Sequence, residues 1–165
     1  MADFPKLIPA FTVQIALRQP TSISPTLTFV PFHSTGGTIV SEPSYPIKLN
    51  AAIEHGADYI TAAPDGRRVG LDVQSTARDS VTGSLVRFTY TGKISMLGDA
   101  GKVLRGEAVA GTATAFGDAF SVVSFEVGSK ELAAMEEKIY VGSGRFILEP
   151  GKPVIVEYKV SEVSA

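Results

Sequence analysis

Apolar and polar residues alternate along several short stretches of this chain. In the segment FTVQIALR (11–18), Phe11, Val13 and Ile15 fall on one face of an extended strand, and Thr12 and Gln14 fall on the other. This period of two predicts a strand with one buried face. Similar runs predict further strands over 36–41, 51–63, 69–77, 84–92, 119–127, 138–149 and 153–163.

Turn residues separate many of these runs. The segments PDGRR, RDSVTG and EPGK stand between consecutive strand-like stretches and predict tight connections. The segment 19–35 contains three prolines, which lack a backbone donor, so we expect it to cross the surface or one mouth of a barrel. Gly56, inside the strand-like segment 51–63, predicts a bulge or a bend.

One segment has helical spacing instead. Leu132, Met135 and Ile139 recur on one helical face, Ser129 precedes them as a candidate cap, and Glu131 lies near the positive end of the helix dipole. The pattern therefore predicts one short helix near 129–138.

About eight to ten short strands with one helix predict an all-β protein. Open strand edges invite aggregation, so such strands either close into a barrel or pack as two sheets, and we predict a single antiparallel β-barrel. A barrel of about eight strands can hold one small ligand, lined by alternate residues of each strand. Neither a repeat nor a linker divides the chain, so we expect residues 1–165 to form one domain.

Composition narrows the classes of function. Fifteen basic and seventeen acidic residues leave a net charge of −2, which disfavours nucleic acid and anionic membranes as partners. The chain has no cysteine, and its two histidines lie far apart, so we expect neither a metal site nor a cofactor. Without a signal-like start or an apolar stretch long enough to span a bilayer, we expect a soluble, cytoplasmic protein.

Carboxyl groups in apolar, strand-like surroundings are the first candidates for chemistry. Asp58, Asp72 and Glu126 all lie in such segments, where desolvation raises the pKa of an unpartnered carboxyl group and makes it a general acid. Arg87 and Arg145 are the matching cations. The alternatives are structural, because buried ion pairs, a capped bend or a capped helix start would use the same residues.

Motifs of other enzyme classes are absent from the sequence. The segment VGSGR (141–145) lacks the spacing and the following helix of a phosphate-binding loop. There is also no Gly-x-Ser-x-Gly elbow with a histidine in usable order, so acyl-transfer hydrolysis is disfavoured.

Six segments, taken in order, resemble the family catalogued as domain of unknown function 3237. They are GGTIVSEP (36–43), GADYI (56–60), LDV (71–73), FEVG (125–128), VGSGR (141–145) and VEYKVSEV (156–163). The resemblance covers most of the chain from Gly36 onward. It implies a calycin-like β-barrel with a central cavity, in a family most of whose members have no assigned activity.

The resemblance also implies a chemistry. A few relatives in fungal secondary metabolism are implicated in closing oxygen heterocycles by adding a phenol hydroxyl across the alkene of a prenyl group, without a cofactor. Acidic positions of the family correspond to Asp58, Asp72 and Glu126, and its closing glycine–arginine segment to Gly144 and Arg145. This chain departs from the family in having Tyr59 where tryptophan is frequent, and Val123 and Ser124 where a Thr-Pro pair is frequent.

We therefore predict a cofactor-independent cyclase for a small hydrophobic or aromatic substrate. Asp58 or Glu126 would protonate the alkene, and Arg87, Arg145, His55 or the resulting carboxylate would polarise or deprotonate the phenol. The remaining predicted substrate-binding residues are Tyr59, Asp72, Phe88, Tyr90 and Phe146. Of these, Phe88, Tyr90 and Phe146 would stabilise the cation with their aromatic faces. The alternatives are a non-catalytic carrier in the same barrel and, with a fully filled barrel, a structural protein. A homo-oligomer is compatible with the sequence.

Overall fold

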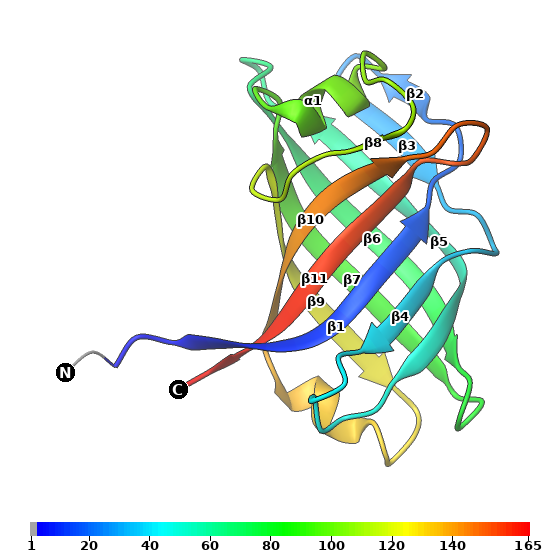
Figure 1. Ribbon diagram of the computed structural model, residues 1–165, viewed down its shortest axis with the longest axis vertical. Helices are drawn as coiled ribbons and strands as arrows, with labels where there is room; N and C mark the ends of the chain where they lie inside the picture. The colour runs from blue at the N-terminus through cyan, green and yellow to red at the C-terminus, as the bar shows by residue number, and fades with distance from the viewer. Residues whose placement is uncertain (1–2) are drawn as a thin grey trace.

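The alternating runs form strands in the computed structural model, which describes residues 3–165 (Figure 1). Their bounds are β1 Lys6–Ala16, β2 Thr21–Ser24, β3 Leu27–Pro31, β4 Thr38–Ser41, β5 Asn50–Ala62, β6 Arg68–Asp79, β7 Leu85–Ser95, β8 Thr112–Ala113, β9 Ala119–Val127, β10 Tyr140–Leu148 and β11 Ile155–Ser164. A short α-helix, α1 (Asp99–Leu104), and a 3₁₀ helix, η1 (Ala133–Glu137), complete the described elements.

Antiparallel pairing closes these strands into a ring. The order is β5, β4, β1, β11, β10, β9, β7 and β6, and β6 pairs back with β5, so the predicted barrel is confirmed with eight positions around its wall. Strand β3 shares the position of β4, because it pairs with β5 farther along that strand. The proline-containing segment 19–35 contributes β2 and β3, which lie beside α1 at one mouth (Figure 1). We call this mouth the α1 end and the opposite mouth the η1 end.

Aromatic side chains fill the half of the barrel toward the η1 end. Phe11 is the centre of this packing, with its ring centroid 5.2–5.5 Å from those of Tyr45, Phe125 and Tyr140. Phe88 extends the cluster from Phe125 at 5.4 Å. All five side chains are buried, so this half of the barrel is a solid core.

A β-bulge in β5 changes which residues face inward. Ala51 and Ile53 are buried, the pairing with β6 then shifts between Ile53 and His55, and beyond the shift Gly56 and Asp58 are the buried residues. The extra residue inverts the inside-outside alternation for the rest of the strand. Asp58 faces the interior for this reason.

The predicted helix near 129–138 is present as the 3₁₀ helix η1. Leu132 and Met135 are buried as expected, whereas Ile139 is 64% exposed because β10 begins at the next residue. The hydroxyl of Ser129 donates to Glu131 at 2.7 Å, so the cap predicted for it is wrong.

Helix α1 was not predicted from the sequence. The carboxylate of Asp118 accepts the N–H of Ala100 at 3.1 Å, so the acid that holds the start of this helix comes from a distant part of the chain. None of the helices in residues 3–165 has the length and apolar character needed to cross a bilayer.

Candidate functional site

Asp58 is a carboxyl group buried in the upper interior, at the α1 end of the barrel. Its side chain projects inward from β5, and the residue is only 7% exposed. Its Oδ1 accepts the backbone N–H of Asp72 at 3.0 Å, and no ion pair within residues 3–165 includes it. Burial raises the pKa of Asp58 to about 7, although the hydrogen bond from Asp72 opposes this rise. The group can therefore hold or release a proton near neutral pH.

Two phenol side chains accompany this carboxyl group. The rings of Tyr90 on β7 and Tyr158 on β11 are 5.1 Å apart, and both residues are buried. Burial raises the pKa of each phenol above its usual range, and the nearby Asp58 charge raises it further. Both tyrosines therefore remain neutral at physiological pH, as hydroxyl groups that can donate or accept a hydrogen bond.

Glycines in β10 make room for the Tyr158 ring. Gly144 pairs with Tyr158 across the two strands, and a Cβ atom on Gly144 would lie 2.6 Å from Cε1 of that ring. A Cβ atom on Gly142 would lie 3.1 Å from Cδ1 of the same ring. The glycines of the VGSGR segment therefore serve packing against an aromatic residue that the sequence analysis did not include in the site. Two glycines at alternate positions of one strand leave room for a large side chain on the strand beside it. This pattern is the signal that could have identified Tyr158.

A small cavity of about 50 Å³ lies among these groups. Asp58, Tyr90 and Tyr158 are its main polar groups, and Leu71, Phe146 and Val156 are among its apolar walls. A hollow of this size holds only a few water-sized groups, so the internal cavity that the family resemblance implied is present but small. The aromatic core fills the rest of the barrel interior, toward the η1 end.

A second hollow of about 190 Å³ adjoins the cavity at the α1 end, and we call it the vestibule. Pro20, Val30, Ile60 and Leu104 line both spaces, so these four side chains stand between them. Leu104 belongs to α1, which places the helix at the entrance.

The structure brings some of the predicted site residues together. Asp58, Tyr90 and Phe146 line the cavity. Phe88 is fully buried and its ring centroid lies 5.5 Å from that of Tyr90, but it belongs to the aromatic core beneath the cavity.

Two predicted catalytic residues lie on the outer wall. Arg87 and Glu126 form an ion pair at 2.5 Å, with 51% and 67% of their side chains exposed. Arg87 also donates to Gln74 at 2.6 Å. These side chains alternate with the inward-facing Phe88 and Phe125 on paired strands, so neither can reach the cavity. Their proposed roles inside the barrel are therefore wrong.

The other predicted residues also point away from the acid. His55 and Tyr59 lie on the outer face, where Tyr59 packs on Phe29 with ring centroids 5.3 Å apart. The side chain of Asp72 is exposed, and only its backbone N–H serves the site.

Arg145 borders the cavity, but its guanidinium is held elsewhere. It pairs with Glu157 at 2.9 Å and lies 4.9 Å above the ring of Phe116. Arg145 alternates with the buried Gly144 and Phe146 along β10, so its side chain points outward and the predicted interior role is wrong.

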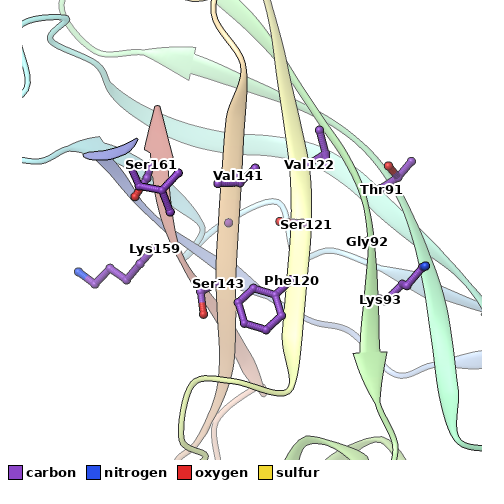
Figure 2. Close-up of a pocket in the computed structure, with 12 residues that line it drawn as sticks. Thr91, Gly92, Lys93, Phe120, Ser121, Val122, Val141, Ser143, Lys159 and Ser161 are labelled. Atoms are coloured by element: carbon purple, nitrogen blue, oxygen red, sulfur yellow. The ribbon is translucent and has the colours of Figure 1, made fainter. Parts of the chain in front are cut away.

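A separate groove of about 560 Å³ runs across the outer wall over β7, β9, β10 and β11 (Figure 2). Phe120, Val122 and Val141 supply much of its apolar lining, with Lys93 and Lys159 near its margin. It contains no carboxyl group and none of the predicted site residues. The buried acid therefore lies in the inner cavity and not in this groove.

The arrangement of these groups suits proton transfer. Among residues 3–165 there is no cluster of three or more histidine, cysteine, aspartate or glutamate side chains able to hold a metal ion. A buried acid that titrates near pH 7, with two neutral phenols and apolar walls, can donate a proton and take one back.

Fold and site together define a small closed β-barrel with a buried acid in an internal cavity. The chain belongs to the family described as "Protein of unknown function (DUF3237)", whose sequence profile matches residues 5–163. No curated protein matches the chain.

Solved structures with the same fold come from several bacteria. A conserved protein of unknown function from Rhodopseudomonas palustris has a TM-score of 0.74 at 19% identity, covering 99% of both chains. A protein of unknown function from Clostridium acetobutylicum has a TM-score of 0.71 at 17% identity, covering 98% of this chain and 100% of its own. A β-barrel-like protein from Acinetobacter baumannii has a TM-score of 0.67 at 20% identity, covering 99% of both chains. At these identities the similarity establishes the fold alone.

Proposed function

We propose that this protein is a cofactor-independent cyclase that adds a phenol hydroxyl across a prenyl alkene within one substrate molecule. The observation that carries the proposal is Asp58, a carboxyl group that is buried, forms no ion pair among residues 3–165 and has its pKa raised to about 7. Such a group is a general acid matched to neutral pH.

The two adjoining spaces suit a substrate that enters with its small apolar end first. The inner cavity takes a branched group of a few carbon atoms, and the vestibule takes part of the aromatic ring that follows. Movement of Leu104 on α1 would open a passage between the two spaces. This pose brings the alkene to Asp58 and keeps water away from it.

The proposed reaction is balanced without a co-reactant. The Asp58 hydroxyl donates its proton to the less substituted alkene carbon, which leaves a tertiary cation. Tyr90, Tyr158 and Phe146 surround this charge, and an aromatic face contributes about 1–2 kcal/mol to its stabilisation when water is excluded. The phenol oxygen then forms the C–O bond, and its proton returns to the Asp58 carboxylate. Substrate and product are isomers.

Positioning accounts for more of the expected rate than proton transfer. Holding the phenol oxygen against the cation is worth roughly 7–11 kcal/mol in favourable intramolecular cases. General acid catalysis contributes about 10²–10⁴-fold. A change that removes only the acid should therefore abolish most turnover and leave substrate binding nearly intact.

The test uses a prenylated phenol and chiral chromatography of the product. Wild-type protein should give one enantiomer of the ring-closed product, and Asp58→Asn should lower the rate by about 10²–10⁴-fold with little change in binding. Glu126→Gln is the matched control, because it also neutralises one carboxyl group but acts on the outer wall. An undiminished rate in Asp58→Asn would exclude the acid step.

A non-catalytic carrier is the second candidate, favoured by the apolar walls of the inner cavity. A carrier would retain the prenylated phenol unchanged. Wild-type binding without any ring closure, equal in Asp58→Asn, would identify this function.

A further inference from the structure

An apolar patch covers the outer wall where β9, β10 and the joined ends of β1 and β11 meet. We call it the outer patch, and it consists of Leu7, Phe120, Val122, Ile139, Val141 and Val163. Leu7, Phe120, Val122 and Ile139 are each between 55% and 64% exposed. Contiguous apolar surface of this kind on a small domain marks an interaction site.

Strand register makes these residues neighbours. Val141 pairs with Val122 on β9 and with Ser161 on β11, and Leu7 pairs with Val163 in the next row. Phe120 and Val122 lie along one strand beside Val141 on the next, as Figure 2 shows. The apolar surface is therefore continuous from β9 to the ends of the chain.

Small residues beneath the outer patch keep the wall thin. Gly92, Ser121 and Gly142 pair across β7, β9 and β10 and face the interior. The groove of about 560 Å³ lies directly over them and is lined by Leu7, Phe120 and others. The patch is concave as well as apolar, which suits a packed interface.

We propose that the outer patch binds a second copy of this chain, related by a two-fold axis close to Val141. An isologous contact places each surface against itself, so opposite corners of the patch meet. One corner carries Lys93, which makes no ion pair among residues 3–165. The opposite corner carries the exposed Asp3, which precedes β1 where the start of that strand pairs with the end of β11 (Figure 1). The two-fold axis therefore brings opposite charges together twice.

The exposed area suits a dimer of ordinary size. A whole phenylalanine side chain offers about 200 Å², so the patch presents roughly 400 Å² of apolar side chain per copy at the observed exposures. A standard interface buries about 800 Å² per partner, and somewhat more than half of it is apolar. The outer patch supplies the apolar centre of such an interface, and the charged corners supply its rim.

Side-chain packing, rather than sheet extension, joins the two copies. The free edge of β1 near Leu7 lies between Pro5 and Pro9, which have no N–H to donate to an added strand. A partner can therefore cover the face of the strands but cannot continue the sheet along this edge.

Sedimentation velocity and light scattering across about 1–100 μM test the proposal. Wild-type protein should be a dimer at the upper concentrations, and Phe120→Glu should be a folded monomer by circular dichroism. Val81→Glu is the matched control, because Val81 is 82% exposed in the β6–β7 turn, away from the patch, and this variant should remain a dimer. Lys93→Glu should raise the dimer Kd about tenfold, which corresponds to about 1.4 kcal/mol. Adding Asp3→Lys in the same chain should restore the dimer.

Several outcomes would overturn the inference. Wild-type protein that stays monomeric at about 100 μM would exclude the dimer. A dimer unaffected by Phe120→Glu would place the interface elsewhere, and a double variant as weak as Lys93→Glu alone would exclude the two-fold arrangement. Monomeric protein that binds an apolar dye, with binding lost in Phe120→Glu, would show that a small molecule occupies the groove instead. None of these outcomes depends on the chemistry of Asp58.

Discussion

The two ends of the barrel each place one carboxyl group beside two tyrosines, but within residues 3–165 only one of these carboxyl groups forms an ion pair. At the η1 end, Glu162 accepts Lys138 at 2.7 Å and the hydroxyl of Tyr45 at 2.5 Å. The hydroxyls of Tyr45 and Tyr140 lie 2.9 Å apart. Hydrogen bonds from Lys138 and Tyr45 lower the pKa of Glu162, so this carboxylate is ionised and fully partnered.

At the α1 end the corresponding acid is Asp58, with Tyr90 and Tyr158. A single backbone N–H reaches Asp58, and burial raises its pKa to about 7. A cavity adjoins it, whereas aromatic side chains fill the other half of the barrel.

The difference teaches how to distinguish a structural acid from a candidate catalyst. A carboxylate that pairs with a lysine is stabilised in its charged form, and the pair links the two elements that carry these side chains. A carboxyl group that lacks a cation and adjoins an open space retains a transferable proton. Residue type alone does not separate the two, because both sites combine one acid with two phenols.

The largest expected effect comes from removing the charge at the α1 end. The folded-state pKa of Asp58, about 7, is above its ordinary value of 3.8, so the folded protein binds more protons between these values and loses stability as pH rises through them. Full ionisation costs on the order of 4 kcal/mol. Asp58→Asn should therefore have a flatter pH dependence and a higher free energy of unfolding at about pH 8. Urea denaturation from about pH 4 to 9 measures this, and equal pH profiles in both proteins would contradict it.

Removing the cation at the η1 end should change the free energy of unfolding by less. This change should grow as pH rises above the ordinary pKa of glutamate, whereas ionised Asp58 lowers stability as pH rises. Lys138→Met leaves Glu162, whose side chain is only 14% exposed, without its ion-pair partner, and should lower the free energy of unfolding by about 1–3 kcal/mol at pH 7. The folded-state pKa of Glu162 is lowered, so its stabilisation is present above the ordinary value of 4.5 and is lost as pH falls further.

Urea denaturation at two pH values separates these contributions. Wild-type and Lys138→Met proteins should converge toward pH 3, and Lys138→Arg should retain most of the stability at pH 7. A stability difference that persists undiminished at about pH 3 would show that lost packing, and not charge, is responsible.

The smallest expected effect concerns the outer wall. Glu126→Gln breaks the ion pair with Arg87, in which both side chains are more than half exposed, and should change the free energy of unfolding by less than about 1 kcal/mol. Thermal denaturation at low and high salt checks this, because screening should remove the small difference that remains. A larger effect would show that an exposed pair matters as much as the cluster at the η1 end.

The sequence predicted the fold well because its evidence is local. Alternation in the segments of β1, β6, β7, β9 and β11 marks the strands, and the turn segments RDSVTG and EPGK mark two of the hairpins. Helix α1 could not be predicted in the same way, because Asp118 holds its first turn from outside the segment. The volume of the cavity was also beyond prediction, because it depends on how aromatic rings from different strands fill the interior.

The candidate site was predicted only in part. Asp58, Tyr90 and Phe146 were named from the sequence and line the cavity, whereas Tyr158 was missed, and the named catalytic residues Arg87 and Glu126 lie on the outer face. The alternation in β7 and β9 showed which residues share a face, but not which of the two faces is inside.

The sequence by itself determined that this chain is all-β and carries acids on its strands, since strand periodicity and turn residues are local properties. Only the tertiary structure decided which acid is buried. The bulge between Ile53 and His55 inverts the alternation of β5 and turns Asp58 inward, whereas uninterrupted alternation from Ile53 would have buried His55 and Tyr59. Closure of the barrel then removes water from Asp58, because the residues that desolvate it come from strands distant in the chain.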